Sequence, residues 1–335
     1  MTLARVEEML LDSFDSLWLD LDGVVYRGSE AVPQAVNSIA RAQQTHKIGY
    51  ITNNSSRTPA AIAEQLRGYG LDLSENQIVG SARAGAKMLL QRIPHGSKVL
   101  VVGGEGLRFE CREVGFEVVD SAADNPSAVI QGFSPDVSWR ELAQASFAVQ
   151  AGAIWIATNQ DWTLPLEAGI APGNGTLVGA VHTAVGILPD FAGKPFEPIF
   201  KQAFEQLGAK APLMIGDRLD TDIRGARKVG VKSAAVLTGI ATRKEIIGSK
   251  LEDRPDFILQ DLSELFLPYP KLKETKRGVR CGDALVEKLV NKVVLVEGDP
   301  ASIDALRAAT SVVWNCGTPI YGLEIEPALY SEGPR

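Results

Sequence analysis

Short apolar runs alternate with longer stretches of helical periodicity along most of the chain. The runs predict buried strands at residues 17–20, 48–52, 99–102, 128–132, 153–158, 213–217 and 233–237. Helices are predicted between them, among others over residues 33–45, 58–69, 106–114 and 198–207. This alternation is typical of α/β proteins, and it predicts a Rossmann-like core with a mainly parallel sheet.

The last part of the chain has a different pattern. Pro268 and Pro270 precede the basic segment KLKETKRGVR (271–280), which indicates a linker between two units. Residues 292–296, 302–309 and 311–314 then predict a strand, a helix and a second strand. Because about 65 residues bury only a small core, we expect this unit to pack against the rest of the chain.

Composition narrows the class of protein. At about 150 residues per domain, 335 residues predict two domains or three. Apolar residues make up 45% and charged residues 22%, which excludes a disordered chain or a disulfide scaffold. The net charge of −7 disfavours nonspecific binding to nucleic acid or to an anionic membrane.

Cysteine usage and hydropathy predict where the protein is found. The chain has 3 cysteines and no CxxC motif, which favours reduced thiols in a cytosol. Acidic residues interrupt the apolar stretch at the N-terminus, so it lacks the core of a signal peptide. No apolar run approaches the roughly 18 residues of a membrane span. We therefore expect a cytoplasmic protein without membrane or nucleic-acid partners.

Three of the predicted strands end in polar side chains. One ends at Asp20 and Asp22, and another ends at Asp217, with Asp222 five residues further on. Ligands of parallel α/β sheets bind beyond the carboxyl ends of the strands, so these carboxylates should gather at one edge. Such crowding is costly without a cation, and Mg²⁺ is the oxygen-ligated cation that fits best.

The third strand ends in donors that suit a phosphoryl group. Thr52 and Asn53 follow it directly, and Lys194, in the segment GKP, offers a compact positive charge. Each signal is weak by itself, because strand-end carboxylates and such turns are common in loops. The order DxDG, TN, KP, GDxxxxD along one chain is much more specific.

With these motifs the chain resembles the haloacid dehalogenase (HAD) superfamily, in the branch of p-nitrophenyl and phosphoglycolate phosphatases. The resemblance covers roughly residues 15–262 and rests on the segments DLDGVVYRG (20–28), TNNSSRT (52–58), TNQD (158–161), PGNGTLVGAV (172–181), GKP (193–195) and GDRLDTDI (216–223). It implies a HAD-type core from residues 1–80 and 185–265, with an inserted α/β cap at 81–184. Residues 271–335 would form a small C-terminal α/β unit.

The resemblance also implies a role for each motif residue. Asp20 would be the nucleophile that forms an aspartyl phosphate, and Asp22 the general acid and base. Mg²⁺ would be held by Asp20, the carbonyl of Asp22 and Asp217, while Asp222 would orient Lys194 or a metal-bound water. Thr52, Asn53, Asn54 and Lys194 would bind the phosphate. Gly23 would allow a tight turn or a close backbone approach beside these groups.

The expected substrate is a small phosphorylated metabolite, because the cap would restrict access to the active site. The segment with Asp161, Trp162 and Leu164 lies where this branch carries its substrate-specificity loop. An alternative interpretation is that Asp161 is a structural loop carboxylate. Trp162 is equally well interpreted as a core residue. The branch's pyridoxal phosphate phosphatases have a His where this chain has Leu164, so a compact, partly apolar wall is expected here.

D-Glycerol 3-phosphate is the favoured substrate, and 2-phosphoglycolate or broad p-nitrophenyl phosphatase activity is the alternative. The tail resembles the acetyltransferase-like appendage of some bacterial D-glycerol-3-phosphate phosphatases, but residues 271–335 contain no Q/R-x-x-G-x-G/A loop for acetyl-coenzyme A. We therefore expect a non-catalytic tail.

A second class of function is a phosphoacceptor signalling module, which also clusters aspartates, a Thr and a Lys on a parallel sheet. The retained Asp22 favours turnover over a stored aspartyl phosphate. A homo-oligomer formed through the cap is a further expectation.

Overall fold

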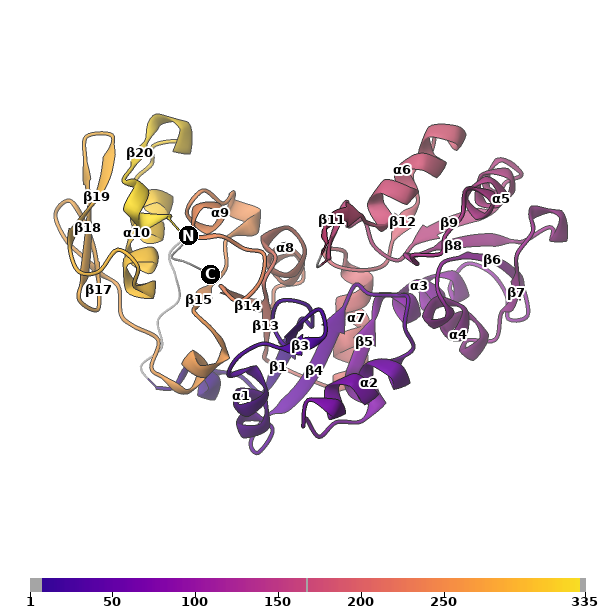
Figure 1. Ribbon diagram of the computed structural model, residues 1–335, viewed down its shortest axis with the longest axis horizontal. Helices are drawn as coiled ribbons and strands as arrows, with labels where there is room; N and C mark the ends of the chain where they lie inside the picture. The colour runs from indigo at the N-terminus through magenta and orange to yellow at the C-terminus, as the bar shows by residue number, and fades with distance from the viewer. Residues whose placement is uncertain (1–7, 167, 332–335) are drawn as a thin grey trace. The chain divides into compact units, whose positions relative to one another are not determined.

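The computed structural model describes residues 8–166 and 168–331 (Figure 1). The chain divides into two compact units, which we call unit 1 (residues 1–48 and 209–335) and unit 2 (residues 49–208). Parallel strands with helices between them recur in both units, so the predicted α/β class with a parallel core is confirmed. The predicted domain boundaries near residues 80, 184 and 270 stay predictions.

Unit 1 contains four parallel strands in the order β15-β14-β13-β1. Their bounds are Ser16–Leu19 (β1), Pro212–Gly216 (β13), Lys232–Val236 (β14) and Phe257–Leu259 (β15). These short apolar runs are almost entirely buried, which explains why they lack the alternating pattern of a half-exposed strand. Since β1 and β13 are parallel and in register from Ser16–Pro212 to Leu19–Ile215, the residues that follow both strands lie at the same edge of the sheet.

Short helices and turns connect these strands. The helices are α1 (Ala35–Ala42), α8 (Arg224–Lys228) and α9 (Arg243–Ile247). The other elements are the hairpin β2 (Tyr26–Arg27) and β3 (Glu30–Ala31), the 3₁₀ turns η1 (Leu10–Ser13), η5 (Leu251–Asp253) and η6 (Leu262–Phe266), and the π-helical turn η4 (Leu219–Ile223). Thr242 caps α9, because its hydroxyl accepts from the Glu245 N–H while the Glu245 carboxylate accepts from Thr242.

The C-terminal part of unit 1 is a five-stranded sheet with one long helix. The sheet runs in the order β16-β17-β18-β19-β20, with only the last pair parallel. Its elements are β16 (Lys273–Glu274), β17 (Gly278–Cys281), β18 (Ala284–Leu289), β19 (Lys292–Glu297), α10 (Ile303–Asn315), η7 (Ile320–Gly322), β20 (Glu324–Ile325) and η8 (Pro327–Leu329).

Two expectations for this region are wrong. The segment predicted as a linker contains β16 and the start of β17, and its Tyr269 and Leu272 are buried. Residues 311–314, predicted as a strand, continue α10. The β-branched residues there favour a strand by propensity, but the buried environment of α10 overrides that local preference.

The C-terminal sheet and helix pack against the rest of unit 1, as expected. Helix α10 contacts β17 and β18 on one side, and α9 and β15 on another. Arg307 of α10 is buried, donates to the Ile258 carbonyl of β15 at 2.7 and 3.0 Å, and pairs with Glu264. Burial lowers the pKa of Arg307, but Tyr269, Glu264 and Asp304 raise it more, so the guanidinium stays charged.

Unit 2 is built on a five-stranded parallel sheet in the order β12-β9-β8-β6-β7. The strands are β6 (Lys98–Val102), β7 (Glu117–Val119), β8 (Ala128–Gln131), β9 (Ile154–Ala157) and β12 (Asp190–Phe191). Helices α5 (Trp139–Gln150) and α6 (Asn174–Val185) cover one face, and α3 (Ser81–Leu90) and α4 (Glu105–Glu113) cover the other (Figure 1). Apolar side chains of α5 and α6 form a core with Leu100, Val102 and Val129 of the sheet.

The remaining elements of unit 2 include the strand that ends at the candidate residue Thr52. Strand β4 (Lys47–Thr52) leads into the unit and pairs in parallel with β5 (Ile78–Gly80). The others are α2 (Pro59–Gly68), η2 (Glu75–Gln77), η3 (Ala122–Asp124), the hairpin β10 (Thr163–Leu166) and β11 (Gly169–Pro172), and α7 (Glu197–Leu207). The predicted helices at 58–69, 106–114 and 198–207 are confirmed as α2, α4 and α7.

Replacing Arg307 by alanine tests the packing of the C-terminal sheet and helix. We expect the free energy of unfolding to fall by about 3 kcal/mol, because the change leaves Glu264 and the buried Ile258 carbonyl without this partner. Arg277→Ala, at an exposed position of the same region, is the matched control and should change it by less than about 0.5 kcal/mol. Denaturant unfolding followed by circular dichroism measures both. An Arg307→Ala protein as stable as the control would contradict this packing.

Candidate functional site

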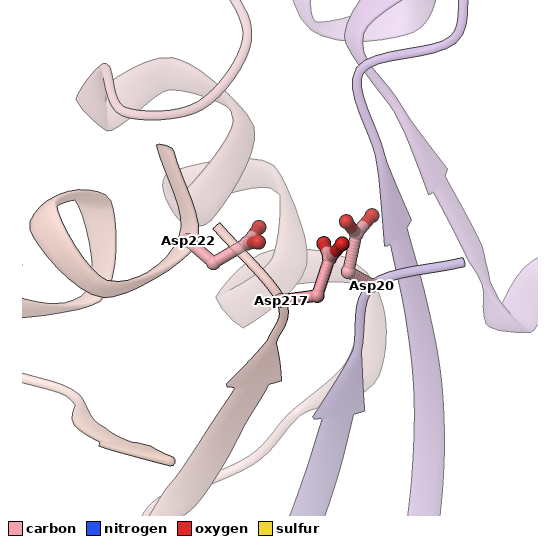
Figure 2. A group of neighbouring side chains, drawn as sticks. All are labelled: Asp20, Asp217 and Asp222. Carbon is pink, nitrogen blue, oxygen red and sulfur yellow. The ribbon is translucent and has the colours of Figure 1, made fainter. Parts of the chain in front are cut away.

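Three aspartates of unit 1 lie together at the carboxyl ends of the parallel strands. One carboxylate oxygen from each of Asp20, Asp217 and Asp222 lies within 4.8 Å of the other two (Figure 2). All three side chains are buried, with Asp222 fully inaccessible and Asp20 only 8% exposed. We call this group the carboxylate cluster.

The strands fix the positions of Asp20 and Asp217. Asp20 follows β1 directly, and its N–H still donates to the Ile215 carbonyl of β13 at 2.9 Å. Asp217 follows β13 directly. Each carboxylate therefore starts from a backbone held by the sheet, which gives the cluster a rigid base.

The loop after β14, residues 237–242, holds Asp217 from the other side. The Ile240 N–H donates to Asp217 Oδ2 at 2.7 Å, and the Ala241 N–H donates to the Asp217 carbonyl at 2.8 Å. A Cβ on Gly239 would collide with the same carboxylate. Only glycine allows the loop to approach Asp217 this closely.

Gly23 meets Asp217 from the turn that follows Asp22. Its φ of 78° is in the left-handed region, and a Cβ there would also collide with the Asp217 carboxylate. The Thr238 hydroxyl donates to the Gly23 carbonyl at 2.7 Å, which ties this turn to the loop after β14. The expectation that Gly23 serves a tight turn and a close approach is confirmed.

Asp222 reaches the cluster from the π-helical turn η4. Its Oδ2 accepts from the Arg218 N–H at 3.1 Å, and a Cβ on Gly216 would overlap its side chain. Such turns are frequent at functional sites. In the same turn, burial raises the pKa of Asp220, but the paired Arg218 guanidinium, a backbone hydrogen bond and the charge of Arg224 together lower it more, so the net pKa is below the ordinary value.

Asp22 lies beside the cluster rather than in it. Its side chain is exposed, unlike those of the three clustered aspartates. The Tyr26 hydroxyl donates to Asp22 Oδ2 at 3.5 Å, and the backbones of the two residues form an isolated bridge. An exposed carboxylate beside a buried anionic cluster is suited to exchange protons with solvent or substrate.

The donor set of the carboxylate cluster fits a hard divalent cation. It consists of carboxylate oxygens alone, the ligand type that Mg²⁺ prefers. Three buried negative groups this close repel one another, and a bound cation removes that cost. The residues present therefore fit the expected metal.

Unit 2 contains a second polar cluster, made of Thr52, Asn53 and Lys194. Lys194 is 1% exposed, and its ammonium donates to the Ile51 carbonyl at 3.0 Å. Asn53 bonds to the backbone of Lys194 twice, since its Oδ1 accepts from the Lys194 N–H and its Nδ2 donates to the Lys194 carbonyl. The structure thus brings together residues separated by about 140 positions, as the motif order requires.

Asn54 has a local role in this cluster. Its N–H donates to the Thr52 hydroxyl at 3.0 Å, and its Oδ1 accepts from both the N–H and the hydroxyl of Ser56. These bonds form a side-chain-stabilised turn after β4. The Asn54 side chain therefore shapes the loop that presents Asn53.

The predicted specificity loop is partly tied to the same cluster. Asn53 Nδ2 donates to Asp161 Oδ2 at 3.1 Å, so Asp161 has the structural contact that a loop carboxylate suggests. Trp162 is 65% exposed, which rules out the reading of this residue as core. Leu164 is half-buried in β10.

Sequence reasoning missed the loop at residues 237–242 and Tyr26. The loop carries a recognisable signal, because a Thr-Gly pair follows the predicted strand at 233–237 and must lie at the same sheet edge as Asp217. Tyr26 carries no such signal in the sequence, because single aromatic residues after turns are common.

Comparison with known families gives two matches. The model of the haloacid dehalogenase-like hydrolases matches residues 17–117, and the HAD-hydrolase-like model matches residues 191–265. These two segments contain the carboxylate cluster as well as Thr52, Asn53 and Lys194.

Two curated relatives of the chain are phosphatases. The chain is 39% identical over 251 residues to D-glycerol 3-phosphate phosphatase of Mycobacterium tuberculosis, covering 75% of this chain and 70% of that protein. It is 32% identical over 253 residues to an acid sugar phosphatase of Staphylococcus epidermidis, covering 75% of this chain and 96% of that protein.

Among solved structures, a glycerol phosphate phosphatase of Mycobacterium tuberculosis, crystallised in complex with magnesium, resembles the chain along nearly its whole length. The TM-score is 0.84 at 34% identity, over 95% of this chain and 94% of that one. The similarity therefore extends into the C-terminal sheet and helix, beyond the 75% shared with the sequence relatives.

Gly239→Ala tests the close approach of the loop to Asp217. We expect binding of Mg²⁺ to weaken by at least about tenfold, because the added methyl group displaces a carboxylate ligand or the loop that orients it. Gly68→Ala, at a position with no atom within 4 Å of the added Cβ, is the control and should bind Mg²⁺ like the unchanged protein. Isothermal titration with MgCl₂ measures the affinity. Equal affinities of the two variants would refute the role of this contact.

Proposed function

The chain belongs to the haloacid dehalogenase-like hydrolases, and we propose that it is a Mg²⁺-dependent phosphatase that hydrolyses D-glycerol 3-phosphate to glycerol and phosphate. The observation that carries the enzyme class is the carboxylate cluster of Asp20, Asp217 and Asp222 at one edge of a parallel sheet. A phosphoacceptor signalling module, the other class considered, stores its acyl phosphate and needs no acid and base two residues after the nucleophile. The pair Asp20 and Asp22 favours turnover.

Asp20 and Asp217 would hold Mg²⁺ through their side chains, together with the carbonyl of Asp22. When bound, Mg²⁺ offsets the negative charge of these carboxylates and of the phosphoryl group. Asp222 would orient a metal-bound water or Lys194, and its own position is fixed by the Arg218 N–H. Gly23 contributes by leaving room for the Asp217 carboxylate.

Asp20 would act as the nucleophile. Its carboxylate oxygen forms a bond to phosphorus while the bond from phosphorus to the glycerol oxygen breaks, and Asp22 gives its proton to that oxygen. In the second step Asp22 takes a proton from water, whose oxygen bonds to phosphorus as the Asp20–phosphorus bond breaks. The products are glycerol and phosphate, with Asp20 and Asp22 restored.

Lys194, Thr52 and Asn53 would bind the phosphate. The ammonium group of Lys194 is a compact charge on a buried side chain, and the hydroxyl and amide supply neutral donors. The two bonds from Asn53 to the Lys194 backbone hold these groups in a fixed relation to each other. Asn54 supports them indirectly by shaping the turn.

The substrate proposal rests on relatives and on the specificity loop. A relative of 39% identity and a structural neighbour of TM-score 0.84 are both named glycerol phosphate phosphatases. Exposed Trp162 and half-buried Leu164 offer a compact, partly apolar wall that suits a short carbon chain. A pyridine ring would lack the His partner that the pyridoxal phosphate phosphatases place at the position of Leu164.

We also propose that residues 81–184 form the cap and that a homo-oligomer forms through it. We further propose that the protein is cytoplasmic. None of the described helices has the length and hydropathy needed to cross a bilayer. For residues 271–335 we propose a non-catalytic role without acetyl-coenzyme A, because the loop that would bind its pyrophosphate is missing from the sequence.

Asp20→Asn tests the nucleophile. We expect phosphate release to fall by roughly 10⁴-fold or more, since an amide cannot form the acyl phosphate. Asp15→Asn is the matched control at the opposite end of β1, where the carboxylate accepts from the N–H groups of Lys210 and Ala211, and it should retain kcat/KM. The assay measures phosphate release with Mg²⁺ and with excess chelator. Turnover in chelator, or by Asp20→Asn once deamidation is excluded, would disprove the mechanism.

A panel of phosphate esters tests the substrate. We expect kcat/KM for D-glycerol 3-phosphate to exceed that for 2-phosphoglycolate, pyridoxal phosphate and p-nitrophenyl phosphate. A value tenfold below that of another physiological ester, equivalent to about 1.4 kcal/mol of transition-state preference, would defeat the assignment while leaving the phosphatase chemistry intact.

A further inference from the structure

The loop at residues 237–242 connects the carboxylate cluster to helix α9. At one end the N–H groups of Ile240 and Ala241 hold the side chain and the carbonyl of Asp217. The Thr238 carbonyl accepts from Arg27, and the Thr238 hydroxyl donates to the Gly23 carbonyl. The loop therefore touches both segments that carry the cluster, and any shift of the loop is transmitted to Asp217.

Arg243 anchors the other end of this loop. It is the first residue of α9, it is only 6% exposed, and its guanidinium donates to four backbone carbonyls. Three of these belong to consecutive residues of the turn before α10, namely Pro300 (2.7 Å), Ala301 (3.0 Å) and Ser302 (3.1 Å). The fourth is the carbonyl of Leu329, at 3.1 Å. All four acceptors lie in the C-terminal part of the chain.

The turn that receives Arg243 is itself ordered by its own bonds. Asp299 Oδ1 accepts from the Ala301 N–H at 2.9 Å, and the Asp299 carbonyl accepts from the Ser302 hydroxyl at 2.7 Å. Ser302 then caps α10 by accepting from the Ala305 N–H. The three carbonyls are therefore presented as a preformed receptor for a planar fork of donors.

We propose that Arg243 is a positioning residue for the metal site, so that the affinity for Mg²⁺ depends on the C-terminal sheet and helix. Arg243 docks α9 on the turn at residues 299–302, α9 fixes the loop at 237–242, and the loop fixes the Asp217 carboxylate. The inference rests on the proposed Mg²⁺ site. It gives the C-terminal region a part in chemistry performed elsewhere in unit 1, without any ligand of its own.

The choice of arginine follows from the geometry. Five donors in a rigid plane can satisfy several carbonyls at once, whereas the lysine ammonium has three donors on a single atom. A lysine at position 243 keeps the charge but loses the fork, so the loop would be held less firmly. A displacement of a fraction of an ångström is sufficient to weaken a metal ligand.

Arg243→Lys tests the proposal, with Arg307→Lys as the matched control. Arg307 is another buried arginine that joins the C-terminal helix to the sheet of unit 1, but its carbonyl partner is Ile258 on β15 rather than the turn at 299–302. Both variants should show lower unfolding temperatures. Only Arg243→Lys should bind Mg²⁺ more weakly, by about tenfold, as measured by isothermal titration at a temperature where circular dichroism shows both proteins folded.

A second variant keeps the test valid if Arg243→Lys does not fold. Asp299→Ala changes an exposed side chain that orders the receiving turn, and it should weaken Mg²⁺ binding in the same direction by a smaller factor. Raising the Mg²⁺ concentration should restore kcat in both variants, because the lost affinity is then compensated by mass action.

Three results separate this inference from the proposed function. Failure of the unchanged protein to bind Mg²⁺ would defeat the metal site itself. Unchanged affinity in folded Arg243→Lys and Asp299→Ala would defeat only the positioning role. Equal weakening in Arg243→Lys and Arg307→Lys would also overturn it, because the effect would then be one of general destabilisation.

Discussion

The repulsion among the buried carboxylates of Asp20, Asp217 and Asp222 is the constraint on which the site depends. At an effective dielectric constant of 20, two unit charges about 4 Å apart repel by roughly 4 kcal/mol. The repulsive free energy of three such pairs would be comparable with the free energy of unfolding of a typical domain. A fold that retains this arrangement must hold it rigidly, and a bound cation would remove the repulsion.

Rigidity comes from backbone groups rather than from long side chains. Strands β1 and β13 set the starting points of Asp20 and Asp217, and the N–H groups of Arg218 and Ile240 bond to the carboxylates of Asp222 and Asp217. Gly23 and Gly239 permit the chain to come within contact of Asp217. Backbone donors with these fixed positions lose little entropy on metal binding, which favours a preorganised site.

The need for a rigid metal site also explains why the C-terminal sheet and helix pack closely against the rest of unit 1. Short strands and a five-residue helix, α9, give the loop at 237–242 little support of its own. Buried Arg243 supplies that support by bonding to main-chain carbonyls of the turn at 299–302, while buried Arg307 joins α10 to the Ile258 carbonyl of β15. Both arginines give up hydration, and the several bonds that each forms offset that loss.

The sequence was sufficient to predict the strands that carry the site and the residues at their ends. A buried apolar run followed by Asp20 or Asp217 is a weak signal by itself, but the rule for parallel sheets places both carboxylates at one edge of the sheet, and the order of the motifs adds specificity. The end of α10 at residues 311–314 was not predictable, because its helical state depends on packing against β17 and β18. The Thr-Gly pair after the predicted strand at 233–237 signals where the loop at 237–242 lies. It does not signal the bonds to Asp217, because these are made by N–H groups, which every residue except proline carries.

Direct trapping of the phosphorylated enzyme is the measurement that tests the central claim most closely. In this experiment the protein, Mg²⁺ and D-glycerol 3-phosphate are mixed, quenched with acid within one turnover and analysed by peptide mass spectrometry after reductive labelling of acyl phosphates. We expect the label on Asp20 and on no other residue. A label on another side chain, or none while phosphate is released in a burst, would contradict it.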